Sequence, residues 1–117
     1  MEKTLALDTL AALGQETRLD VFRLLVKAGR TGMNAGAISD ALAVRPNTLS
    51  THLGVLARSG LVSATREGRS IIYTADLDVM QELVRYLLQD CCGGNPDLCG
   101  PLVTALSCSP GMKSGEC

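Results

Sequence analysis

Apolar and polar residues recur with the period of amphipathic helices over roughly the first half of the chain. A short helix is expected over Thr4–Leu13, where Gly14 ends it. A stronger helix is expected over Gln15–Ala28. Its apolar positions recur at helical spacing and are Leu19, Phe22, Leu25 and Val26. This pattern indicates that the N-terminal part of the chain is helical.

Two shorter helices follow, and a tight connection joins them. Asn34 is a candidate N-cap for the first of them. After Ala43-Val44-Arg45, Pro46 suits the first turn of the second helix, because its missing N–H would be unpaired there anyway. This second helix carries leucines on one face, at positions 49, 53 and 56, and stops near Gly60.

The period then changes from helix to strand. The segments Leu61–Arg66 and Arg69–Thr74 are β-prone, and Glu67-Gly68 between them predicts a hairpin. From Asp76, a candidate N-cap, a last helix extends to about Gln89. Its apolar residues are Leu77, Val79, Met80, Leu83, Val84, Leu87 and Leu88. They cover more than one narrow stripe, so this helix needs a second surface, for which a partner subunit is the natural supplier.

Helix, tight turn, helix and hairpin form the layout of a winged helix-turn-helix, a mainly α fold with a β-hairpin wing (α+β). The second helix of such a fold enters the DNA major groove, and the hairpin touches the flanking backbone. Opposite the leucines, the helix presents short hydrogen-bonding side chains suited to base edges and phosphates: Asn47, Thr48, Ser50 and Thr51. Four arginines are placed to meet phosphates, at the ends of this helix and at the hairpin tip: Arg45, Arg58, Arg66 and Arg69. Taken singly, such residues are most often a solvated surface, and it is their order along the chain that favours DNA.

One glycine of this helix is unusual. Gly54 costs a helix interior about 1 kcal/mol relative to Ala, which indicates close approach of a packed helix or of DNA.

Charge and composition sharpen this picture. The 117 residues carry a net charge of −1, which on its face argues against a DNA-binding protein. Residues 1–75 hold nine basic and six acidic residues (+3), whereas residues 76–117 hold two and six (−4). No apolar run approaches the roughly 18–20 residues of a membrane span, and the N-terminus does not read as a secretory signal. We therefore expect a cytoplasmic protein with a mildly basic DNA-reading part.

Three segments carry a specific family resemblance: residues 13–22 (LGQETRLDVF), 47–62 (NTLSTHLGVLARSGLV) and 66–73 (REGRSIIY). Together they resemble the ArsR/SmtB family of bacterial transcriptional repressors, over about residues 5–90. The resemblance implies a homodimer that binds an imperfect palindrome in operator double-stranded DNA and releases it when a metal or metalloid binds. It also adds His52, which matches a near-constant histidine of the family, to the expected DNA-binding residues. For His52, ligation of a metal is disfavoured, because a lone histidine beside a leucine face is more often packed and hydrogen-bonded.

The chain departs from the family pattern at three places. Arg45 stands where the family usually has a small N-cap residue, and Thr51 stands where many members carry Arg. The segment 32–41 contains no cysteine, although the best-known inducer motif of the family, Cys-Val-Cys, lies there. Imidazole-based zinc sensing is disfavoured as well, because the chain has one histidine.

All five cysteines fall in the last part of the chain, at Cys91, Cys92, Cys99, Cys108 and Cys117. We expect residues 1–90 to form the DNA-binding and dimerisation domain and residues 91–117 an inducer-binding tail. Cys91 and Cys92 end the last helix, and the Gly-Gly-Asn-Pro that follows allows Cys99 to return to them. Three soft thiolates suit arsenite or antimonite, and some family members place cysteines in this way.

Other readings of these thiols stay open. Methylarsenite would need only Cys91 and Cys92, and cadmium, lead or mercury are equally soft. A thiol-redox repressor would instead form a disulfide with Cys99. An enzyme is disfavoured, because the cysteine pair lies at a helix C-terminus beside Asp90 with no general base in sight. A metal-buffering protein is the remaining alternative, and it would lack sequence-specific DNA binding.

Overall fold

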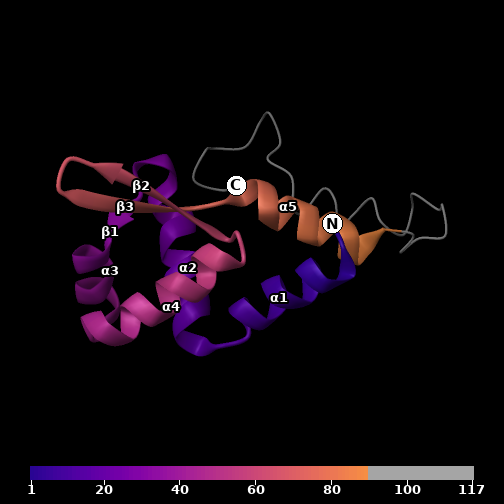
Figure 1. Cartoon of the computed structure of the whole chain (residues 1–117), viewed down its shortest axis with the longest axis horizontal. Coiled ribbons are helices and arrows are strands. Elements are labelled where there is room, and N and C mark those ends of the chain that lie inside the picture. Colours follow the sequence, from indigo (N-terminus) through magenta and orange to yellow (C-terminus); the bar gives the residue numbers. More distant parts are fainter. Residues whose placement is uncertain (90–117) are drawn as a thin grey trace. The chain divides into compact units, whose positions relative to one another are not determined.

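A computed structural model describes residues 1–89, which form helices and one antiparallel sheet (Figure 1). The helices are α1 (Lys3–Leu13), α2 (Glu16–Ala28), α3 (Ala35–Leu42), α4 (Pro46–Arg58) and α5 (Leu77–Leu88), with a 3-10 turn, η1 (Gly29–Thr31). The strands are β1 (Met33–Asn34), β2 (Val62–Glu67) and β3 (Ser70–Ala75). The chain divides into two units, Met1–Tyr86 and Leu87–Cys117. The predicted tail, residues 91–117, lies outside the described residues, so the expected domain boundary stays a prediction.

The helix starts follow the capping residues of the sequence. The Asn34 side-chain oxygen accepts the N–H of Ala37 at 2.8 Å, at the start of α3. Pro46 occupies the first turn of α4. The Asp76 carboxylate accepts the N–H of Val79 at 3.2 Å and so caps α5. These three predicted helix starts are confirmed.

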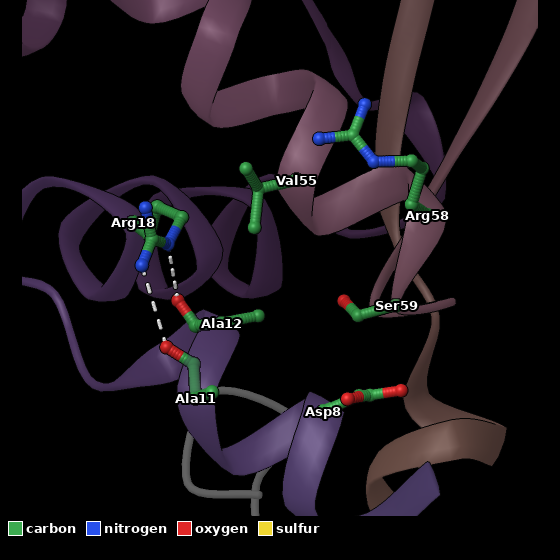
Figure 2. Close-up of a pocket in the computed structure, with 7 residues that line it drawn as sticks. All are labelled: Asp8, Ala11, Ala12, Arg18, Val55, Arg58 and Ser59. Atoms are coloured by element: carbon green, nitrogen blue, oxygen red, sulfur yellow. Dashed lines mark hydrogen bonds between the residues drawn. The ribbon is translucent and has the colours of Figure 1, made fainter.

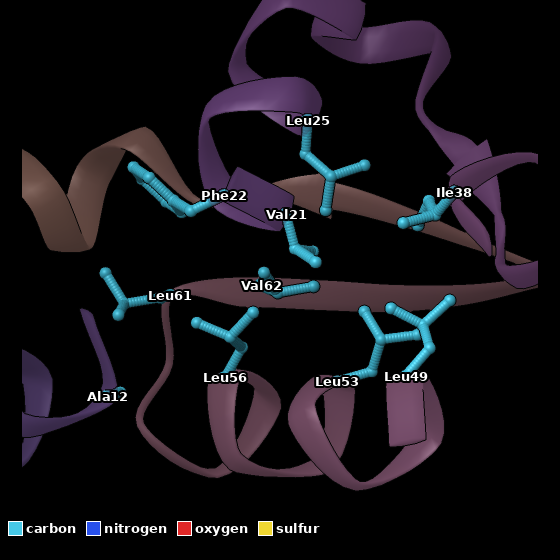
Figure 3. Packing of buried hydrophobic residues seen from close by; sticks show 10 residues of the cluster. All are labelled: Ala12, Val21, Phe22, Leu25, Ile38, Leu49, Leu53, Leu56, Leu61 and Val62. Atoms are coloured by element: carbon cyan, nitrogen blue, oxygen red, sulfur yellow. The ribbon is translucent and has the colours of Figure 1, made fainter. Parts of the chain in front are cut away.

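One aliphatic core holds α2, α3, α4 and the start of the wing together (Figure 3). The buried side chains of this cluster are Ala12, Val21, Phe22, Leu25, Ile38, Leu49, Leu53, Leu56, Leu61 and Val62. The leucine face predicted for α4 is therefore confirmed. On α2, only some of the apolar residues at helical spacing lie in the core: Leu19 and Val26 are 43% and 41% exposed, whereas Val21 is fully buried. The reason is that Val21, Phe22 and Leu25 form the side of the helix that packs on the core.

The sheet has three strands in the order β1-β3-β2, all antiparallel, so the wing carries one strand more than predicted. Met33 pairs with Tyr73, which brings the start of the helix-turn-helix onto β3. Gly32 makes this approach possible. Its φ is +67°, and an added Cβ would lie 2.5 Å from the carbonyl oxygen of Tyr73.

The hairpin turn is shifted by one residue from its predicted place. Glu67 pairs with Ser70, so the turn residues are Gly68 and Arg69 rather than Glu67 and Gly68. Gly68 has a φ of +61°, the backbone region that glycine adopts without strain at the first position of a two-residue hairpin loop.

Helices α1 and α5 expose apolar side chains. Leu7 and Leu10 on α1 are 57% and 41% exposed, and Leu77 at the start of α5 is 55% exposed. On α1, Ala6, Thr9 and Ala12 form the buried side. Within residues 1–89, no helix is long and apolar enough to cross a membrane.

Candidate nucleic-acid interface

The turn between α3 and α4 sets the angle at which α4 leaves the helix pair. Ala43 adopts the left-handed conformation (φ 54°) and ends α3. Ser39 holds Val44 in place by two hydrogen bonds. Its hydroxyl donates to the carbonyl of Val44, and its own carbonyl accepts the N–H of Val44 at 3.1 Å. The tight connection predicted from the sequence is therefore held by local hydrogen bonds.

Helix α4 separates a buried face from an exposed polar one. The leucines at positions 49, 53 and 56 lie at most 2% exposed in the core. The predicted DNA-reading residues are all exposed: Asn47, Thr48, Ser50 and Thr51. The Thr51 hydroxyl donates to the carbonyl of Asn47 at 3.3 Å, and a hydroxyl in this position keeps its lone pairs available as acceptors. We refer to these four residues as the polar face of α4.

Arg45 precedes this helix without capping it. Its carbonyl accepts the N–H of Leu49 at 2.9 Å, but its side chain makes no cap hydrogen bond. The exposed guanidinium is therefore not committed to the helix end. A basic group stands beside the helix N-terminus, where phosphate groups are favoured.

Gly54 lies on the same side of α4 as the polar face. An added Cβ would meet only the Nη1 atom of Arg58, at 3.3 Å, among atoms within 4 Å. This is the far end of a flexible side chain, which can move away. Packing within the described residues thus does not explain the glycine.

The wing presents the other two arginines. Arg66 lies on β2 opposite Ile71, Arg69 lies in the turn, and both are exposed. The wing and α4 belong to one packed unit, because Val62 at the base of β2 lies in the same core as the leucines of α4. The sites predicted for backbone contact are thereby held on the same framework as the polar face.

His52 contacts another helix rather than standing alone. It is half-buried on α4, and its Nδ1 atom lies 3.3 Å from Nη1 of Arg18 on α2. This contact joins residues 34 positions apart, and sequence reasoning did not anticipate that Arg18 is the partner of His52. No local pattern would have revealed it, because the pairing depends on how α2 packs on α4. A DNA contact by His52 stays a prediction.

The candidate inducer ligands cannot be placed. Cys91, Cys92 and Cys99 lie outside the described residues, as do Cys108 and Cys117. Within residues 1–89, no group of three or more His, Cys, Asp or Glu side chains is arranged to hold a metal ion.

Comparison with known proteins places the chain among transcriptional regulators. A family model described as a helix-turn-helix domain matches residues 13–63. The chain is 30% identical over 87 residues to the transcriptional repressor SdpR of Bacillus subtilis. This alignment covers 74% of this chain and 93% of that protein. It is 29% identical over 86 residues to the transcriptional activator HlyU of Vibrio cholerae, covering 74% and 77%.

Solved structures agree with the fold. An ArsR-like transcriptional regulator from Rhodococcus sp. RHA1 superposes with a TM-score of 0.69 and 26% identity, over 87% of this chain and 93% of the other. The homodimeric winged helix-turn-helix domain of Mb0332 from Mycobacterium bovis, a possible ArsR-family regulator, superposes with a TM-score of 0.61 and 28% identity, over 74% and 81%. The predicted winged helix-turn-helix is therefore confirmed.

Proposed function

This chain belongs to the ArsR-like family of winged helix-turn-helix transcriptional regulators, and we propose that it is a repressor released by a thiophilic metalloid. It binds operator DNA as a homodimer through α4 and the wing. Trivalent arsenic or antimony, bound by Cys91, Cys92 and Cys99, weakens that binding. The chain acts on DNA in the reducing cytoplasm, where these thiols stay available.

The polar face of α4 is the observation that carries the DNA-binding part of the proposal. The helix is anchored by fully buried leucines, while the side facing away from them holds four exposed residues with short hydrogen-bonding side chains. A rigidly held helix with such a face suits the base edges of the major groove. Arg45, Arg58, Arg66 and Arg69 supply the charge for phosphate contacts.

Selection from random duplexes tests this step. Full-length reduced protein should enrich an imperfect palindrome whose half-sites lie about one helical turn apart, or a multiple of it. Binding of the selected duplex should weaken steeply as salt is raised, because phosphate contacts release counterions. A chain that enriches no sequence would instead be a metal-buffering protein.

The homodimer is supported by the exposed leucines of α1. Leu7 and Leu10 are one helical turn apart on α1, and both are more than 40% exposed. Leucines this exposed gain free energy when a second surface covers them. A symmetric dimer supplies that surface and also doubles the number of recognition helices, as a palindromic operator requires.

The direction of regulation differs among the relatives, since one is a repressor and another is an activator. We assign repression because release by a ligand at the end of α5 needs no contact with the transcription machinery. A reporter gene carrying the selected palindrome in its promoter should be silenced by the wild-type protein. Increased expression would instead show activation.

The inducer is assigned from the chemistry of the thiols. Trivalent arsenic and antimony are three-coordinate and thiophilic, and two adjacent cysteines with a third a few residues later offer that donor set. Because α5 ends just before Cys91, ligation there acts next to a second helix whose apolar residues are expected from the sequence to need a partner surface. A ligand that prefers the DNA-free state lowers DNA affinity by the coupling free energy, typically about 1–3 kcal/mol.

Titration of the protein–DNA complex tests the inducer. Arsenite should release the wild-type protein, and a Cys91→Ser, Cys92→Ser variant should stay bound. A Cys108→Ser, Cys117→Ser variant is the matched control and should respond like wild type. If the Cys91→Ser, Cys92→Ser variant is released as readily as wild type, the assignment is wrong. Parallel titrations with antimonite, methylarsenite, cadmium, lead and peroxide identify the natural class of inducer.

A further inference from the structure

The junction between α1 and α2 makes direct contact with the recognition helix α4. Arg18, in the first turn of α2, donates from Nε to the carbonyl of Ala12 at 2.6 Å and from Nη2 to the carbonyl of Ala11 at 3.3 Å. These two hydrogen bonds are drawn in Figure 2. The remaining arm of the guanidinium, Nη1, lies 3.3 Å from Nδ1 of His52. One side chain therefore links three helices.

Each of these contacts satisfies a chemical requirement. The last carbonyls of α1 lack the N–H partners of the regular helical pattern, although that of Ala11 also accepts the N–H of Gly14 at 3.2 Å. A guanidinium at the C-terminus of a helix is favourably placed. Arginine has five N–H donors and no acceptor. In a hydrogen bond between these two side chains, Nδ1 of His52 is therefore the acceptor. The contact thus constrains the orientation of the His52 ring.

We propose that Arg18 is a positioning residue for DNA recognition, which holds α4 in register with α1 through His52. This inference rests on the proposed function, because it assumes that α4 reads DNA. His52 follows Thr51 and lies one turn after Thr48, so a change in the position of its ring displaces the polar face of α4. Helix α1 carries the exposed leucines, and Arg18 consequently connects the proposed dimer surface to the proposed DNA surface.

Arg18 borders an open groove between α1 and α4. This open groove of about 340 Å³ is lined by Asp8, Val55, Arg58 and Ser59 together with Arg18 and Ala12 (Figure 2). Close packing does not fill this space, and Arg18 bridges it at one end. The buried leucines lie on the other side of α4, so we expect the contact between Arg18 and His52 to orient this side of the helix.

A double-mutant cycle on affinity for the selected duplex tests the proposal. Arg18→Gln should weaken binding about 10-fold, the equivalent of one charge-assisted hydrogen bond. His52→Leu removes the acceptor and should also weaken binding. In the His52→Leu background, Arg18→Gln should cost less than about 2-fold more, because the two residues act through one contact. His52→Asn retains an acceptor near the Nδ1 position and should recover most of the affinity that His52→Leu loses.

A matched control separates positioning from stability. The Gln15 side chain accepts the backbone N–H of Arg18 at 2.9 Å and caps α2 at the same junction. Gln15→Ala should lower the stability of the fold but leave the affinity for the duplex unchanged. Urea unfolding of each variant records the loss of stability.

The outcomes are distinct from those that test the proposed function. If wild type selects no duplex, the proposed function fails, and this inference fails with it. If wild type binds but the effects of Arg18→Gln and His52→Leu multiply, or Gln15→Ala weakens binding as much as Arg18→Gln, Arg18 is merely structural. If Arg18→Gln does not fold, the contrast between His52→Asn and His52→Leu decides, because both variants keep the bonds to α1. Equal affinities of those two variants would overturn the proposal.

Discussion

Adding one methyl group at Gly54 of the recognition helix α4 should change the stability of the fold and its DNA affinity in opposite directions. Gly54→Ala replaces the residue with the highest backbone entropy in a helix interior, which should stabilise the fold by about 1 kcal/mol. The new Cβ meets Arg58 Nη1 at 3.3 Å, and that flexible group can withdraw, so little of this gain is lost. For a unit of this size the gain corresponds to a rise in Tm of about 4–8 °C.

DNA binding should respond in the opposite direction. The position lies on the side of α4 that carries Asn47 and Thr51, where a close approach to the duplex leaves no space for a methyl group. Lifting the helix weakens at least one base contact, worth about 1–3 kcal/mol, so affinity should fall about 10-fold or more. Thermal unfolding at fixed protein concentration and fluorescence anisotropy with the selected duplex measure the two effects.

Gly36→Ala is the matched control for this prediction. It makes the same substitution in α3, where the added Cβ would lie 3.4 Å from the side-chain oxygen of Asn34. We expect it to raise Tm without weakening DNA binding, because it leaves the exposed side of α4 unchanged. If Gly54→Ala gains stability and keeps its affinity, close approach of DNA is not the reason for the glycine. A loss of stability would instead reveal packing against α4.

Three further predictions concern the wing, the dimer and the sheet. Arg66→Gln combined with Arg69→Gln should flatten the dependence of log K on log salt by about 0.9 for each phosphate that is no longer neutralised, and an unchanged slope would remove the wing from the interface. Leu7→Glu should shift the protein to monomer in analytical ultracentrifugation and weaken binding to the palindrome, whereas a persistent dimer would place the interface elsewhere. Gly32→Ala should destabilise the fold by more than about 1 kcal/mol in urea unfolding, because its Cβ would lie 2.5 Å from a strand carbonyl; wild-type stability would contradict that geometry.

The sequence predicts the parts of this fold that are determined locally. Asn34 and Pro46 mark helix starts by their own hydrogen-bonding chemistry, and the leucine period of α4 selects its buried face. Pairing between distant segments is a different matter. Strand β1 consists of two residues and exists because Tyr73, 40 positions after Met33, lies beside it. No propensity in so short a segment distinguishes it from a loop.

The candidate site divides in the same way. The exposed residues of the polar face follow from the period of α4, because they are those opposite the buried leucines. The partner of His52 does not follow, because Arg18 reaches it only after α2 has packed on α4. Likewise, the exposure of Leu19 depends on which side of α2 the core occupies. Contacts of this kind are set by tertiary packing, and the spacing of apolar residues along the sequence does not predict them.

The placement of Arg18 also constrains how a ligand can act on DNA binding. We call α4 and the wing of one protomer its DNA-binding head. In a symmetric dimer, affinity for a palindrome depends on the shape of each head and on the distance between the two recognition helices. Arg18 joins α1 to α4 within one protomer, so the leucine-bearing helix and the recognition helix move together. A ligand that alters the dimer interface therefore changes the distance between heads and leaves each head intact. Binding to a single half-site should then be insensitive to the inducer, whereas binding to the full palindrome is abolished, and equal weakening at both would place the effect within the head.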